Sequence, residues 1–239
     1  NRRPYATTPL TAEEKTALLE AARPFSEARV KIVEDQEKLK LLGQALSANE
    51  IVMFENPLLY RLFFKEIVWT EEEEQNKKAG LFIKTLELKP PQEAMMKIFR
   101  YWPIMKIFNA LGLARMIAED NARIYSSSAL MGAIIIEERD ENFITAGRVM
   151  ERLWLRATEM KLGFHLITGV MFLRQRLQAR EKTGFLKKHQ NLIEKAYQDI
   201  ASIFEARDGL AALVFRVGKS DGPSARSSRL PAKMIEGGA

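Results

Sequence analysis

Residues 141–164 read ENFITAGRVMERLWLRATEMKLGF and carry the clearest helical pattern in the chain. Apolar side chains recur there at three- and four-residue steps, which is typical of a helix with one face turned to a core. Leu162-Gly163 ends the predicted helix, because glycine readily adopts the left-handed C-terminal turn. The small pair Ala146-Gly147 would let another backbone or a flat ligand approach closely. We therefore expect a central helix with these inward residues: Phe143, Ala146, Met150, Leu153, Trp154, Ala157 and Met160.

The composition is that of an ordinary globular protein, with 239 residues, 46% of them hydrophobic and 28% charged. The absence of cysteine, with only His165 and His189 present, argues against disulfides, thiolate chemistry and a histidine-rich metal centre. No apolar run approaches the roughly 20 residues that cross a bilayer, so we expect no stable membrane insertion. The chain begins at Asn1 without Met and shows no signal-peptide pattern. We expect missing residues before Asn1 and a cytoplasmic location.

The charge distribution points to a small anionic ligand rather than to nucleic acid. Lys+Arg 37 against Asp+Glu 31 gives a net charge of +6, and most of the basic residues are scattered through charge-mixed helices. No zinc or aromatic RNA-binding pattern accompanies them. The basic excess is strongest at the two ends of the chain, which a small anion could bridge: Arg2 and Arg3 at one end, Lys219, Arg226, Arg229 and Lys233 at the other.

Four segments read as strands. Residues 29–34 alternate apolar and polar, which is typical of a half-buried strand, and residues 129–136 form a continuous apolar run that favours a buried one. Residues 162–168 and 210–217 give two more strands. The fold class is therefore α+β, with a mixed or antiparallel sheet in one domain spanning 1–239. A helical insertion is expected at about 50–125.

The remaining segments read mainly as helices. Thr11 predicts an N-cap, and Pro24 stops the helix that follows. Thr70–Glu74 could cap the start of a further helix, but its plain interpretation is a solvated acidic turn. A metal cluster is not expected there, because adjacent carboxylates on a helix cannot converge on one metal ion. Further helices are predicted at about 36–48, from Asn56-Pro57 through Trp69, at 92–113 with a break at Trp102-Pro103, at 114–125, near 171–174 and at 187–206.

No catalytic cluster is visible in the sequence. It has neither a Gly-rich phosphate loop nor a Gly-x-Ser-x-Gly elbow. His165 lies among apolar residues, so we interpret it as a hydrogen-bonded core histidine rather than a catalytic one. Trp69, Trp102 and Trp154 are interpreted as core residues rather than as a cofactor box.

Three blocks of sequence stand in the same order as in a known family. They are NRRPYATTPL at 1–10, the helix at 146–163, and FRVG at 215–218 with RSSRLP at 226–231. They resemble the N-terminal motif, the central helix and the last strand with its basic tail in the nitroreductase family. The middle, 57–88, is similar to a branch of larger nitroreductase-like proteins that includes a flavin-sequestering type.

The resemblance implies an FMN-binding α+β fold, a homodimer with flavin at the subunit interface, and basic residues of both termini at the FMN phosphate. Guanidinium groups suit a phosphate, because they donate paired, charge-assisted hydrogen bonds. The usual Asn and Gln-Pro-Trp segment after the first helix is missing, and Ser26 and Arg29 are its only plausible polar replacements. The candidate cofactor-binding residues are Asn1, Arg2, Arg3, Ser26, Arg29, Gly169, Arg226, Ser227 and Arg229.

The function implied by this resemblance is that of an FMN-dependent oxidoreductase of nitroreductase type. NAD(P)H would reduce the flavin, which would then reduce a small-molecule electron acceptor in a ping-pong cycle. One alternative is a non-catalytic flavin-binding or sequestering protein, in which the insertion acts as a lid. Another is a helical protein of lipid or membrane surfaces, given the Met- and aromatic-rich stretches and the charge of +6.

Overall fold

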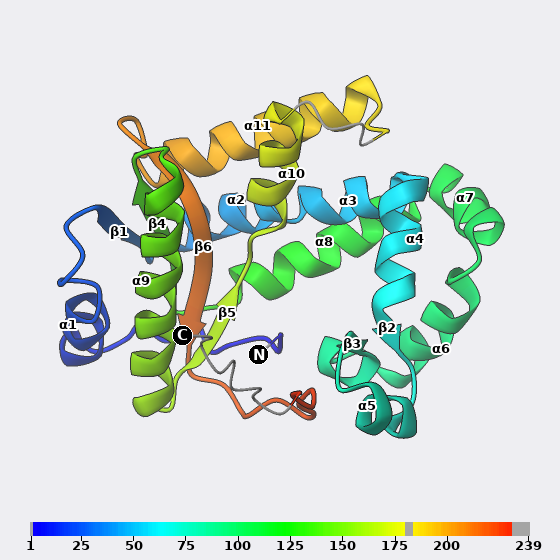
Figure 1. The fold of residues 1–239 in the computed structure, drawn as a ribbon, viewed down its shortest axis with the longest axis horizontal. Helices are drawn as coiled ribbons and strands as arrows, with labels where there is room; N and C mark the ends of the chain where they lie inside the picture. The colour runs from blue at the N-terminus through cyan, green and yellow to red at the C-terminus, as the bar shows by residue number, and fades with distance from the viewer. Residues whose placement is uncertain (1, 180–183, 231–239) are drawn as a thin grey trace, which may run out of the picture.

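The computed structural model describes residues 2–179 and 184–230, and its centre is a four-stranded antiparallel sheet (Figure 1). The strand order is β1-β4-β6-β5. All four predicted strands are confirmed, and the sheet is antiparallel rather than mixed. Their bounds are Ala28–Val33 (β1), Leu130–Ile136 (β4), Gly163–Leu166 (β5) and Leu210–Gly218 (β6).

β4 occupies the interior of the sheet because its whole sequence, LMGAIII, is apolar and every residue of it is buried. It pairs with β1 on one side and with β6 on the other, with a register shift between Ile134 and Ile135. Gly132 is required at its position. A Cβ there would lie 2.3 Å from the Phe215 ring, which fills the space above the strand.

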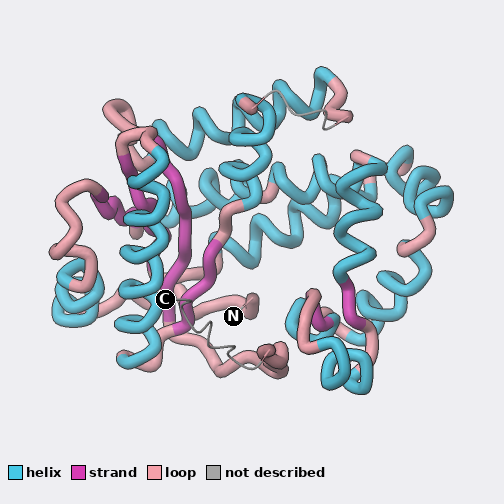
Figure 2. Tube along the Cα trace, in the orientation of Figure 1, coloured by secondary structure: helices cyan, strands magenta, loops and turns pink. Residues whose placement is uncertain are grey.

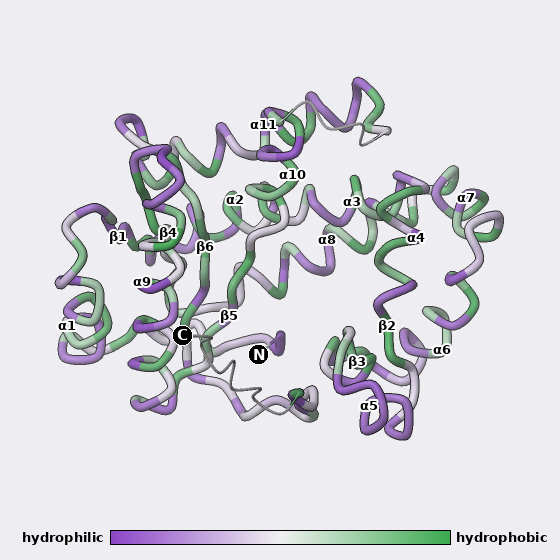
Figure 3. Tube along the Cα trace, viewed as in Figure 1, coloured by the Kyte–Doolittle hydropathy of each residue, from purple (hydrophilic) through white to green (hydrophobic). Residues whose placement is uncertain are grey.

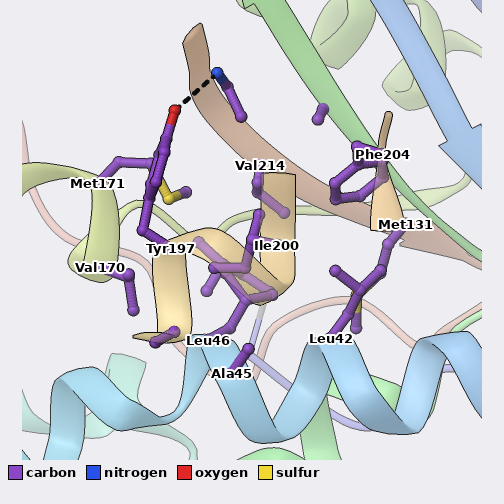
Figure 4. Packing of buried hydrophobic residues seen from close by; sticks show 14 of the residues in the cluster. Leu42, Ala45, Leu46, Met131, Val170, Met171, Tyr197, Ile200, Phe204 and Val214 are labelled. Atoms are coloured by element: carbon purple, nitrogen blue, oxygen red, sulfur yellow. Dashed lines mark hydrogen bonds between the residues drawn. The ribbon is translucent and has the colours of Figure 1, made fainter. Parts of the chain in front are cut away.

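Helices cover both faces of the sheet. On one face lie α1 and α9, and their buried residues join the strands in a cluster that includes Leu18, Val149 and Phe215. On the other face lie α2, α10 and α11, where Leu42, Tyr197 and Ile200 pack on the strands (Figure 4). The bounds are Ala12–Glu20 (α1), Gln36–Leu46 (α2), Asp140–Glu159 (α9), Gly169–Gln178 (α10) and Lys187–Ile203 (α11).

The central helix α9 is confirmed, but its C-terminal end was predicted wrongly. It ends at Glu159, and the left-handed residue after it is Lys161, with φ 58°. Gly163 instead begins β5 and leaves room for Tyr5, whose ring would lie 2.9 Å from an added Cβ. Nothing described approaches Gly147 within 4 Å of where a Cβ would stand, so the predicted close approach at Ala146-Gly147 is not made within this chain.

The inward face of α9 also differs from the prediction at Trp154. This side chain is 48% exposed and stacks on Phe164, with ring centroids 5.8 Å apart. Val149, which was not among the predicted inward residues, is fully buried. Helical spacing predicts the stripe of residues that faces the core. It does not show which edge of that stripe the strands leave exposed.

The segment between β1 and β4 continues from α2 into an excursion of short helices, which we call the helical insertion (residues 48–126). A two-residue parallel pair, β2–β3, lies within it, apart from the main sheet (Figure 2). The bounds are Ala48–Glu55 (α3), Pro57–Glu66 (α4), Ile67–Val68 (β2), Glu71–Lys77 (α5), Leu81–Phe82 (β3), Ile83–Leu86 (η1, a 3-10 helix), Pro90–Phe99 (α6), Trp102–Ala110 (α7) and Leu113–Ser126 (α8).

Three details of the insertion correct the sequence reading. Thr70 caps a helix, α5, by accepting a hydrogen bond from Glu73 N at 3.1 Å, so the preferred interpretation as a turn is wrong and the alternative of a helix start is confirmed. The helix predicted at 36–48 stops at Leu46, and α3 follows after Ser47. The β2–β3 pair was not predicted, because two-residue strands are too short to show a period. The break predicted at Trp102-Pro103 is confirmed.

Side chains from several of these helices hold the insertion together. Tyr60 contacts the rings of Phe64 and Trp102 at centroid distances of 4.6 and 5.1 Å. A second cluster surrounds β2–β3 and includes Phe82 and Ile83. Among the described helices, none is long and apolar enough to cross a membrane. Residues 219–230 follow β6 and have no regular secondary structure.

Candidate functional site

The N-terminal arm, residues 2–6, lies against the ends of β5 and β6. Tyr5 N donates to Ser127 O at 2.9 Å, and Ser127 Oγ donates back to Tyr5 O at 2.8 Å. Ala6 N donates to Lys219 O at 2.8 Å, which ties the arm to the beginning of the C-terminal tail. The two ends of the described chain are therefore held side by side near the gap between the sheet and the insertion (Figure 1).

Arg216 of β6 contacts this arm and holds its backbone in place. Its side chain is fully buried, and its Nη2 donates to Arg3 O at 2.8 Å while its Nε donates to His165 Nδ1 at 3.1 Å. Nη1 donates to the carbonyls of Ile124 and Ser127, and the guanidinium lies 4.1 Å from the centre of the Tyr5 ring. Burial lowers the pKa of Arg216 to about 10. Carbonyl dipoles and a π face stabilise its charge.

His165 acts as an acceptor in this network. Its Nδ1 receives the Arg216 hydrogen bond, so the ring is neutral with the proton on Nε2. Burial, reinforced by the positive charge of Arg216, holds its pKa well below the ordinary value. The predicted hydrogen bond of His165 is confirmed, although the residue is half-buried rather than part of the core.

A buried carboxyl lies behind the arm. Glu50 of α3 accepts a hydrogen bond from Tyr125 Oη at 2.7 Å, and its Oε2 has no hydrogen-bond partner among the described residues. Burial raises the pKa of Glu50 to about 7, while the Tyr125 hydrogen bond and the positive charge of Arg2 oppose the rise. Arg2 itself is exposed.

The two termini also meet at the helical insertion. Arg3 Nε donates to Glu87 Oε2 at 3.0 Å, and Ser224 N of the tail donates to Glu87 Oε1 at 2.7 Å. Burial alone would raise the pKa of Glu87, but these hydrogen bonds lower it overall. Further along the tail, Ser228 N donates to the buried Glu74 of α5. The Arg3 side chain is therefore paired with Glu87. Hydrogen bonds to Glu87 and Glu74 hold the tail against the insertion.

Three arginines of the two terminal segments have guanidinium groups that are open to solvent. Arg2, Arg226 and Arg229 are exposed, and within the described residues none of them has a carboxylate at ion-pair distance. Ser227 is exposed beside them. Exposed guanidinium groups on two segments that are pinned to each other are suited to a small multiply charged anion.

Gly169 begins α10, and its lack of a side chain lets Asn49 of α3 pack closely. A Cβ there would lie 2.3 Å from Asn49 Cγ. The preceding residue, Thr168, makes no side-chain cap. The first N–H groups of an α-helix have no partner within the helix, so they favour negatively charged or acceptor groups nearby.

Not every candidate residue lies here. Arg29 pairs in register with Ile135 near the end of β4 and donates to Asp208 O at 3.4 Å, whereas the arm contacts Ser127 before β4 begins. Ser26 precedes β1 at the same remote end. Within one chain, Ser26 and Arg29 are therefore separated from the terminal arginines by the length of the sheet. Asn1 lies outside the described residues.

The sequence reading missed Glu50, Tyr125, Glu87 and Arg216. Arg216 left a signal, since it is the one charge in the apolar strand sequence LAALVFRVG. A charge in a buried strand usually has compensating partners. Glu50, Tyr125 and Glu87 lie in segments of mixed polarity, where nothing marks them as buried.

Comparison with known proteins gives a fold but no close relative. No family model and no curated protein matches the sequence. Iodotyrosine deiodinase, solved with FMN and 3-iodo-L-tyrosine, superposes with a TM-score of 0.51 at 11% identity, over 99% of this chain and 94% of that one. The NfrA1 nitroreductase of B. subtilis gives 0.50 at 13%, over 99% and 70%. The fold is nitroreductase-like.

This confirms the α+β fold implied by the three sequence blocks. At such low identity the likeness concerns the arrangement of helices and strands. The nitroreductase-like fold alone assigns no ligand, because one fold serves many functions.

Proposed function

We propose that this nitroreductase-like protein is an FMN-dependent oxidoreductase that takes reducing equivalents from NAD(P)H and passes them to a small-molecule acceptor. The observation that carries the proposal is the meeting of the two termini, with Arg2, Arg226 and Arg229 exposed and without carboxylate partners among the described residues. Structural neighbours that include an FMN-bound deiodinase support the same choice of cofactor.

The residues present fit FMN in chemical type. A phosphate near charge −2 needs several convergent guanidinium groups, and the arm and the tail can supply Arg2, Arg226 and Arg229. Ser227 can add a hydroxyl donor. The uncapped N-terminus of α10 at Gly169 offers N–H groups that would favour electron-rich atoms of a flavin ring. No acid–base side chain is demanded, which agrees with the absence of a catalytic cluster in the sequence.

Protein groups in this proposal bind and orient. Arg216 fixes the backbone at Arg3 and the ring of Tyr5, so the cationic arm is held in place before the ligand arrives. Glu87 holds Arg3 and the tail together. When bound, FMN would accept a hydride from NAD(P)H and deliver the electrons in a second half-reaction, a ping-pong cycle.

A homodimer is part of the proposal. Two hollows of the described surface lie elsewhere, one between α2 and α11 and one beside Trp69. A flavin ring near Gly169 would therefore need cover from a second copy of the chain. Ser26 and Arg29, remote from the arm of their own chain, would serve as ligands only across such an interface.

The decisive experiment is a titration of the purified protein with FMN and, separately, with riboflavin, which lacks the phosphate. Arg229→Ala should weaken FMN binding by at least about 1.5 kcal/mol, as expected for a charge-assisted hydrogen bond, and leave riboflavin binding unchanged. Arg139→Ala, whose guanidinium pairs with Glu137 far from the arm, is the matched control and should bind FMN normally.

Turnover is tested on the same FMN-loaded protein under anaerobic conditions. NADH or NADPH should bleach the absorbance of the oxidised flavin, and addition of an acceptor should restore it. A protein that binds neither FMN nor riboflavin contradicts the proposal. One that binds FMN but keeps its absorbance with both nicotinamides is a flavin-sequestering protein instead.

A further inference from the structure

The helical insertion exposes an unusual amount of apolar surface. Helices α6 and α7 form the end of the molecule farthest from the four-stranded sheet (Figure 1), and apolar segments run along them (Figure 3). Large apolar patches on a protein surface mark interaction sites. The exposed fractions of the side chains are Met95 43%, Ile98 55%, Tyr101 52%, Ile107 65%, Phe108 40%, Leu111 76% and Met116 61%; we call this set the apolar tip.

Basic side chains are interleaved with the apolar tip. Between residues 92 and 116 the only acidic residue is Glu93, which already pairs with Lys97 at 3.3 Å. The next acids, Glu119 and Asp120, follow a turn later on α8, and Asp120 pairs with Arg123. The exposed cations of the region are Lys97, Arg100, Lys106 and Arg115.

A hollow beside the apolar tip combines an aromatic ring with two of these cations. Its volume is about 280 Å³, and Trp69, Lys97 and Arg100 line it. Arg100 also donates to Tyr101 Oη at 2.6 Å and lies 4.8 Å from the centre of that ring. Tryptophan and tyrosine next to lysine and arginine are the residues that occupy the boundary between lipid headgroups and acyl chains.

We propose that the apolar tip is a docking surface for an anionic phospholipid bilayer. The apolar side chains of α6 and α7 enter the outer part of the acyl layer, and the four cations contact the phosphate groups around them. The hollow at Trp69 takes one lipid phosphate between Lys97 and Arg100. This surface is separate from the terminal arginines of the flavin proposal, and its test does not depend on flavin.

Charge favours a bilayer over a second copy as the occupant. In a twofold dimer each residue of such a patch faces the same patch on the partner, so Lys97, Arg100, Lys106 and Arg115 of both copies would be brought together. Like charges at close range oppose that pairing, whereas anionic headgroups neutralise it. The outer face of α9 differs from the apolar tip in its charge. Its exposed Ile144 and Leu155 lie among charges of both signs.

The test is co-sedimentation of the full chain with phosphatidylcholine vesicles, prepared with and without phosphatidylserine, at about 0.15 M salt. Binding should rise with phosphatidylserine and fall as salt is added. The variant Ile107→Ser/Leu111→Ser should reduce partitioning roughly tenfold, because both side chains are exposed and their loss leaves the core intact. Lys106→Gln/Arg115→Gln should remove the preference for phosphatidylserine.

The matched control is Ile144→Ser/Leu155→Ser on α9, which removes equally exposed apolar side chains and should bind vesicles as the parent does. Circular dichroism confirms that each variant is folded. Absence of binding to phosphatidylserine vesicles overturns the proposal, as does an equal loss in the control. So does a result in which Ile107→Ser/Leu111→Ser abolishes self-association in sedimentation velocity but keeps vesicle binding.

Discussion

The four-stranded sheet and the helical insertion bury their apolar residues in different ways. β4 is buried along its whole length, with β1 and β6 beside it and helices on both faces. The insertion packs smaller clusters around Tyr60 and Phe82 and leaves the apolar tip exposed. β4 therefore leaves no apolar side chain exposed, whereas the insertion leaves a set of them on its surface, and such surfaces mark interaction sites.

The largest expected effect lies in the sheet. Phe215 is fully buried, stacks on Phe164 with centroids 5.0 Å apart and fills the space above Gly132. Phe215→Ala should therefore lower the free energy of unfolding by about 4 kcal/mol, measured by urea denaturation. Ile144→Ala, at a position 70% exposed on α9, should change it by no more than about 0.5 kcal/mol. Similar losses in the two variants would contradict the described core.

The next effect lies where the two regions join, at the Glu50–Tyr125 pair. The folded-state pKa of Glu50 is about 7, against an ordinary value of 4.5, so the folded protein holds this proton more tightly than the unfolded chain does. The resulting stabilisation is full below about pH 4.5 and is lost as pH rises through about 7, an amount on the order of 3 kcal/mol. Glu50→Gln cannot ionise and should not show this loss.

Urea denaturation of both proteins at about pH 5 and about pH 8 measures the difference. The parent should lose more stability than Glu50→Gln over this interval. The same loss in both would mean that another group, and not Glu50, titrates there. Tyr125→Phe provides a second comparison, because it removes the hydrogen bond that favours the ionised carboxyl.

The sequence predicted the sheet well because its strands are marked locally. The apolar run at Leu130–Ile136 and the alternation that starts near Arg29 are visible within a few residues. The buried polar network is not marked in this way. Arg216 donates to Arg3 O across 213 positions of sequence, and Tyr125 donates to Glu50 across 75. Such pairs are fixed only when the whole fold brings them together.

The candidate site was predicted in part for the same reason. The terminal arginines attracted attention through their charge, and the structure brings the two terminal segments together. Glu74 and Glu87, which hold the tail and Arg3, were not identified. Glu74 was assigned to a solvated turn, because four successive glutamates give no indication that one of them is buried beneath a distant segment.

The smallest expected effects lie at the helix caps, one at α1 beside the sheet and one at α4 in the insertion. Thr11 caps α1 through a single hydrogen bond to Glu14 N at 3.1 Å, whereas Asn56 caps α4 through Leu58 N and Leu59 N and also donates to Gly184 O at 3.2 Å. Thr11→Ala should cost about 1 kcal/mol of unfolding free energy. Asn56→Ala should cost about 2 kcal/mol, because this buried side chain makes both the cap and the hydrogen bond to Gly184 O.

Both values can be read from urea denaturation, and Asn56→Asp separates the two contributions of Asn56. Aspartate keeps the acceptor for the α4 cap but removes the amide donor to Gly184 O. If Asn56→Asp is as stable as the parent, the cap alone accounts for the effect, and the bond to Gly184 O contributes nothing measurable. A loss equal to that of Asn56→Ala would place the whole effect in the bond to Gly184. An intermediate loss is expected, because the cap and the tether are made by different atoms of one side chain.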